Sequence, residues 1–104
     1  MGLYFITLYC HHREPLFGRV VAREMVLNSA GQVAYEQWLE TARIRSAIRL
    51  HEFVIMPNHM RGIIEILPTG EMNIAKLGDV VRGYRSSVTK MMRLLPDREG
   101  VSMW

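Results

Sequence analysis

Cysteine is almost missing from this chain: among its 104 residues only Cys10 carries a thiol. A single cysteine excludes an internal disulfide and a metal cluster built on cysteines, and it fits a reducing, intracellular setting. Residues 1–7 offer neither a basic stretch nor a small-residue cleavage site, so secretion is not predicted. We therefore expect a cytoplasmic protein and interpret Cys10 as a small strand residue.

Long apolar runs are also lacking. No stretch of 18 or more apolar residues occurs, so we expect no membrane-spanning helix. Internal repeats and low-complexity tracts are absent from the sequence as well. Because 49% of the residues are hydrophobic, disorder is not expected, and the length suits a single core. The sequence thus predicts one domain over residues 1–104.

Lysine is scarce, with two residues against eleven arginines, and the formal net charge is +3. Between Asn73 and Leu95 there is one acid, Asp79, and five bases: Lys76, Arg82, Arg85, Lys90 and Arg93. Arginine binds phosphate in a bidentate manner and stacks on bases better than lysine does. The pattern favours an anionic partner, with nucleic acid first. An ordinary solvated basic surface explains so small a net charge equally well.

Hydrophobic spacing predicts strands and helices in alternation. We expect a strand over Leu3–Tyr9 with both faces at least partly covered, then a helix from Ala30 to about Ile44 that is capped near Asn28. Two strands follow as a hairpin, over Ala47–Met56 and His59–Leu67, and a second amphipathic helix runs from Ile74 through Leu95.

Two further segments are less regular. Residues 20–27 fit either a short strand or a loop packed on the sheet, and residues 101–104 resemble the beginning of another strand. The resulting order is β-α-β-β-α followed by an incomplete strand. Two helices on one face of an antiparallel sheet form the ferredoxin-like arrangement, so we predict an α+β fold of that kind.

The corner between the hairpin strands carries the most distinctive residues. Pro57 breaks the strand, Asn58 suits a turn, and His59 begins the returning strand. Because side chains alternate along a strand, His59 and Arg61 share one face while Met60 points the other way. Such a pair of positions can present half a metal site. From the spacing alone, the simpler interpretation is that His59 ends a hairpin and Arg61 is solvated.

Four blocks of the chain resemble, in the right order, the IS200-like transposase family, which includes the transposases associated with repetitive extragenic palindromes. The blocks are Tyr4–Thr7, Arg13–Gly18, Val54–Ile64 and Leu77–Thr89. The resemblance implies a single-strand DNA transposase of the HUH type. In that family two histidines separated by one hydrophobic residue hold Mg²⁺ or Mn²⁺, and a tyrosine on a later helix attacks the scissile phosphate. Family members pair as dimers and recognise DNA hairpins.

Carried over to this sequence, the resemblance makes His59 the first metal-binding histidine and Met60 the intervening hydrophobic residue. Arg61 stands where the second histidine belongs, and a protonated guanidinium has no lone pair to give a metal. It could instead hold a phosphate. The last family strand and the helix with the nucleophilic tyrosine correspond to a region beyond Trp104. No catalytic residue is therefore predicted within the chain.

The tyrosines that are present do not match the catalytic position. They are Tyr4, Tyr9, Tyr35 and Tyr84, and Tyr84 lies on the apolar stripe of its helix, where a core role is expected. Whether the chain is an enzyme stays open on this evidence. A working nuclease would need the tyrosine from a full-length partner. An incomplete sheet would also leave Val101, Met103 and Trp104 exposed and would favour dimers through strand pairing.

The leading hypothesis is a transposase-type domain that binds hairpin or single-stranded DNA, forms a homodimer and is impaired in cleavage. Its candidate DNA contacts are all arginines: Arg61, Arg82, Arg85, Arg93, Arg43 and Arg45, with Arg49 beside them. The alternative is a small α+β binding module or gene remnant with no nucleic-acid role. Stacking on bases needs exposed aromatic rings, and most of those here fall on apolar stripes or strands, which favours the alternative.

Overall fold

The computed structural model describes residues 2–45, 47–67, 74–96 and 102–104. Its elements follow the predicted order, with one added hairpin. They are β1 (Gly2–Tyr9), a 3-10 turn (His11–Arg13), β2 (Gly18–Val21), β3 (Glu24–Leu27), α1 (Ser29–Ile44), β4 (Ile48–Met56), β5 (His59–Ile66) and α2 (Ile74–Met92). None of the described helices is long and apolar enough to cross a membrane.

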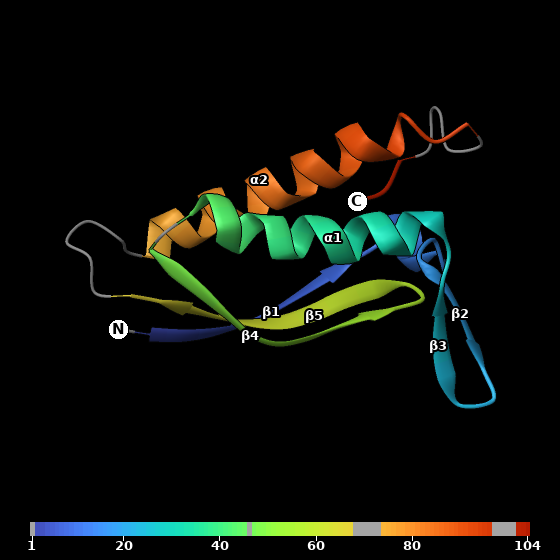
Figure 1. The fold of residues 1–104 in the computed structure, drawn as a ribbon, viewed down its shortest axis with the longest axis horizontal. Coiled ribbons are helices and arrows are strands. Elements are labelled where there is room, and N and C mark those ends of the chain that lie inside the picture. The colour runs from blue at the N-terminus through green and yellow to red at the C-terminus, as the bar shows by residue number, and fades with distance from the viewer. Residues whose placement is uncertain (1, 46, 68–73, 97–101) are drawn as a thin grey trace.

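The main sheet has three antiparallel strands in the order β1-β5-β4, with β5 in the centre. Figure 1 shows α1 and α2 lying together over one face of this sheet. The arrangement confirms the predicted α+β fold with a ferredoxin-like antiparallel sheet and both helices on one side. His59, at the start of β5, pairs with Tyr9 on one neighbour and with Met56 on the other.

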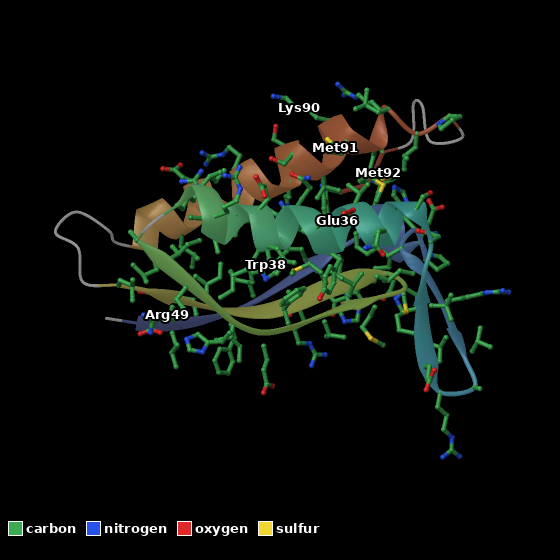
Figure 2. All side chains as sticks on the ribbon, in the orientation of Figure 1. Glu36, Trp38, Arg49, Lys90, Met91 and Met92 are labelled. Atoms are coloured by element: carbon green, nitrogen blue, oxygen red, sulfur yellow. The ribbon has the colours of Figure 1, made fainter. Side chains whose placement is uncertain are left out.

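The core lies between the helices and the sheet. Trp38 of α1, Tyr84 of α2 and Met60 of β5 are all fully or almost fully buried, and Figure 2 shows Trp38 between α1 and the strands. The rings of Trp38 and Tyr84 meet edge to face with centroids 5.0 Å apart. The Tyr84 hydroxyl donates a hydrogen bond of 2.8 Å to the Ala34 carbonyl oxygen. The core role predicted for Tyr84 is thus confirmed.

The start of α1 is fixed by two contacts of the Asn28 side chain. Its Oδ1 accepts a hydrogen bond from the Gly31 amide at 2.8 Å, and its Nδ2 donates to the Leu16 carbonyl at 3.0 Å. This is the N-cap that the sequence predicts. Gly31 itself lies against the preceding chain, because a Cβ there would come within 2.1 Å of the Phe17 carbonyl oxygen. Helix α1 can therefore dock closely only with glycine at this position.

Residues 18–21 and 24–27 form a second, two-stranded sheet, which settles the ambiguity of residues 20–27. Strands β2 and β3 pair antiparallel, with Val21 opposite Glu24 at the end of the hairpin. The two tip residues, Ala22 and Arg23, have positive φ angles of 51° and 67°, the backbone that a tight two-residue hairpin turn requires. The hairpin projects away from the main sheet (Figure 1).

One face of β1 is open, which corrects the expectation that both faces are covered. Leu3 is 58% exposed and Phe5 is 77% exposed, whereas Leu8 on the alternate face is buried beneath the helices. The reason is that α1 and α2 pack on the same side of the sheet. No described element lies across the other side.

The last described residues, 102–104, lie beside the end of β1, although they form no regular strand. The His11 amide donates to the Met103 carbonyl at 2.8 Å, and the Trp104 indole donates to the Arg85 carbonyl at 3.1 Å. Met103 is only 2% exposed and Trp104 is partly buried. The expected exposure of these two side chains is therefore wrong, because they fill the space between α2 and the turn after β1. Val101 lies outside the described residues.

Candidate functional site

His59 is positioned by the corner that precedes it. Its Nδ1 lies 2.8 Å from the Oδ1 of Asn58, and its ring packs against Tyr9 with centroids 5.4 Å apart. Because the amide oxygen accepts, Nδ1 carries the hydrogen and Nε2 keeps a lone pair. Asn58 thus orients the ring in the way that an outer-shell partner orients a metal-binding histidine.

Arg61 lies two residues along β5 on the same open face, opposite Thr7 of β1 and Val54 of β4. It is exposed, while the intervening Met60 is completely buried toward the helices. The alternation predicted for this stretch is confirmed. Among the described residues, no carboxylate lies within ion-pair distance of the Arg61 guanidinium.

The charge of Arg61 affects the pKa of the His59 ring. Partial burial of the ring, and after it the positive charge of Arg61, lower the pKa of His59 below its ordinary value of 6.5. A site that disfavours a proton through a neighbouring cation disfavours a divalent metal ion for the same reason. In the part of the chain that the structure describes, no group of three or more His, Cys, Asp or Glu side chains converges.

The donor set therefore does not fit Mg²⁺ or Mn²⁺, the ions that the family resemblance implies. These ions prefer oxygen ligands, and His59 offers one imidazole nitrogen beside a guanidinium. Arg61 suits an anion such as a phosphate instead. On this face Arg61 offers a guanidinium to an anion, whereas His59 offers a single nitrogen ligand to a metal ion.

The candidate arginines on the helices differ in how available they are. Arg82 is held by Asp79 at 2.8 Å, and Arg43 pairs with Glu40 one helical turn away. Arg45 reaches from the end of α1 to α2, since a Cβ at Gly83 would lie 3.1 Å from its guanidinium. The exposed ion pairs of Arg82 and Arg43 are weak, so these arginines can exchange their carboxylate partners for phosphates.

Arg85 and Arg93 have no carboxylate partner among the described residues and are both exposed. The Arg85 guanidinium lies 5.7 Å from the centre of the Trp104 ring, a cation–π contact that holds it near the C-terminal residues. Arg49 lies on β4, where it approaches Glu65 at 3.8 Å, and His51 contacts the same carboxylate at 2.8 Å.

The candidate DNA-contact residues thus fall on two sides of the molecule. Arg61 and Arg49 lie on the open face of the sheet, whereas the other candidates, Arg43, Arg45, Arg82, Arg85 and Arg93, belong to the helical layer. The sequence does not separate the arginines of the sheet from those of the helices, because spacing within one element does not show on which side of the molecule that element lies.

Sequence reasoning missed a hollow on the open face. A cavity of 360 Å³ lies over the three strands. Its lining residues are Phe5, Glu52, Phe53, Val54, Arg61, Gly62 and Ile63. The available signal was the alternation of Leu3, Phe5, Thr7 and Tyr9 along β1, which places two aromatic rings and a leucine on one side.

Comparison with known proteins bears on the fold. No family model matches the chain. The solved structure of a REP-associated tyrosine transposase bound to a REP hairpin superposes over 99% of this chain with a TM-score of 0.61 and 19% sequence identity. The chain shares the fold of the matched part of that transposase.

A curated relative extends the comparison at the sequence level. An uncharacterized protein of Haemophilus influenzae is 34% identical over an alignment that covers 88% of this chain and 61% of that protein. The matched part of the transposase is 53% of its chain. This chain therefore spans about three-fifths of the length of its relative and about half of the length of the transposase.

Proposed function

We propose that this chain is a transposase-type DNA-binding domain that binds hairpin and single-stranded DNA and is impaired in metal-dependent cleavage. The observation that carries the proposal is the fold that it shares with a transposase bound to a REP hairpin. The arginine-rich composition supplies the phosphate contacts that such binding needs.

The helical layer offers the most available cations for the hairpin backbone. Arg85 on α2 and Arg93, the residue directly after α2, are exposed and lack a carboxylate partner among the described residues, and Arg82 and Arg43 can leave their surface ion pairs. A duplex stem presents closely spaced phosphates, so several arginines acting together release counterions and make binding sensitive to salt.

The impairment of cleavage has two supports within the described residues. Arg61 occupies the position of the second metal-binding histidine of the HUH pattern, and its charge opposes a metal ion at His59. Tyr84 is buried and its hydroxyl donates a hydrogen bond to the Ala34 carbonyl oxygen, so it cannot attack a phosphate. The homodimer that the family resemblance implies belongs to the same proposal, and sedimentation of the purified chain tests it.

Fluorescence anisotropy with a labelled DNA hairpin and a matched duplex, over a salt series, tests the binding. We expect the chain to prefer the hairpin and its affinity to fall steeply with salt. The double variant Arg85→Ala/Arg93→Ala should weaken hairpin binding, while Arg19→Ala/Arg23→Ala removes the same charge from the projecting hairpin and serves as the control.

No binding of any DNA at low salt would refute the proposal and favour a small α+β module without a nucleic-acid role. Equal losses in the two double variants would show that net charge alone, and not the α2 surface, determines the affinity.

A further inference from the structure

Phe5 is unusual among the aromatic side chains of this protein. It stands in the middle of β1 on the open face, pairs across the sheet with Ile63, and is 77% exposed. A phenylalanine ring this exposed adds almost no hydrophobic stabilisation to the fold, because it stays in water. Tyr9, four residues along the same face, is 44% exposed.

The ring of Phe5 borders the 360 Å³ cavity on this face, which we call the sheet basin. The volume lies at the low end of the range of small-ligand sites. One wall is apolar, from Phe5, Val54 and Ile63, and Arg61 supplies the cation. An apolar wall beside a guanidinium matches a planar ring that carries an anionic group.

The other charges on this face leave Arg61 available. Glu65 is already engaged by His51 and Arg49, and Glu52 lines the basin without coming within ion-pair distance of Arg61. At the far end, Arg13 lies over the Tyr9 ring at 4.4 Å from its centre. Arg13, Arg49 and Arg61 thus stand against the carboxylates of Glu52 and Glu65, a balance of one positive charge, and the face as a whole favours an anion.

We propose that the sheet basin holds an unpaired nucleobase of a single strand that adjoins a hairpin, with the base stacked on Phe5 and a neighbouring phosphate on Arg61. This inference rests on the proposed function, because it adds a second contact surface to DNA that the helical layer binds. Base–aromatic stacking accepts any base, since every base has a π-face. Phe5 is then a positioning residue for the unpaired strand.

Two aromatic rings on this face are exposed, contrary to what the apolar stripes of the sequence indicate. A lack of exposed aromatic rings favoured a module without a nucleic-acid role. The structure exposes Phe5 and Tyr9 on one face beside Arg61, and stacking platforms for single strands are built from such rings next to cations.

Three labelled DNA probes test the inference: a blunt hairpin, the same hairpin with a single-stranded tail of thymidines, and that hairpin with an abasic tail. The abasic tail keeps the phosphates and lacks the bases. We expect the thymidine tail to tighten binding, and Phe5→Ala to weaken the tailed complex about tenfold while leaving the other two probes unchanged. Phe5→Trp should retain the affinity.

Leu3→Ala is the matched control, because Leu3 is 58% exposed on the same face of β1 but does not line the basin. Substituting either exposed side chain should leave the thermal melting of the protein almost unchanged. If Phe5→Ala binds the tailed hairpin as wild type does, the inference is overturned, and retained binding of the blunt hairpin keeps the proposed function.

Two other outcomes are informative. Failure of wild type to bind any of the three probes overturns both proposals. A dimer in sedimentation that Phe5→Ala converts to a monomer would assign this face to a second copy of the chain and overturn the base site.

Discussion

His59 and Arg61 lie side by side on the open face of β5, and the guanidinium helps to lower the pKa of the imidazole. Burial contributes first and the charge of Arg61 second. The relationship matters because the family resemblance assigns a metal to this pair of positions. We propose that a cation fixed at the second position favours an anion there over a metal ion.

Removing the charge at residue 61 should raise the pKa of His59 toward 6.5. Because the folded-state pKa is depressed, neutral His59 supports the fold above the ordinary value, and this support is lost as the pH falls through the folded-state value. Arg61→Ala should reduce this loss of stability at low pH. NMR titration of the His59 ring measures its pKa, with Arg49→Ala as the control. An unchanged pKa in Arg61→Ala would contradict the coupling.

Restoring a histidine at residue 61 should create metal affinity. In Arg61→His a second imidazole replaces the guanidinium on the same face, so we expect Mn²⁺ to bind at least about tenfold more tightly than to wild type. Isothermal titration calorimetry gives the affinities. Arg61→Gln removes the charge without adding a nitrogen ligand, and it separates relief of repulsion from coordination. Equal affinity in wild type and Arg61→His would show that Arg61 does not block the site.

Two helical glycines should respond to alanine in opposite directions. At Gly31 a new Cβ would meet the Phe17 carbonyl, so Gly31→Ala should destabilise the protein by about 1–3 kcal/mol. At Gly78 nothing lies within 4 Å, so Gly78→Ala should stabilise it by roughly 0.5–1 kcal/mol. Urea unfolding measures both, and a loss of stability at Gly78 would show that its surroundings are more crowded than the structure indicates.

Freeing Arg82 from Asp79 should strengthen DNA binding. The pair is exposed, with a nitrogen–oxygen distance of 2.8 Å. Asp79→Asn should release one guanidinium to a phosphate and raise the slope of affinity against salt by about one. Anisotropy with the hairpin probe measures the slope. Glu24→Gln removes an equal charge from β3, and an equal gain there would assign the effect to net charge.

Much of the fold was predictable from local patterns. The helical spacing from Ala30 onward and from Ile74 onward gave both helices, and Asn28 marked the cap of the first. Pro57 with Asn58 fixed the corner between β4 and β5, because proline cannot continue a central strand. The alternation of His59, Met60 and Arg61 followed from strand geometry alone.

Residues 20–27 show where local patterns were insufficient. The hairpin turn at Ala22 and Arg23 uses two positive φ angles without glycine or asparagine, so the usual turn signal is missing. The burial of Met103 was equally hidden. The Met103 carbonyl oxygen accepts a hydrogen bond from the amide of His11, a residue at the other end of the chain, and no spacing within either segment indicates this contact.

The sequence by itself determined which side chains share a face: His59 with Arg61, and Leu3 with Phe5, because the period of a strand is two. Only the tertiary structure decided which face is open, since that depends on where α1 and α2 dock. Their packing on one side buried Met60 and left Phe5 in water beside Arg61. The same packing placed the arginines of the helices on the other side of the molecule from Arg61. Local spacing could not show this, because it does not encode contacts between distant elements.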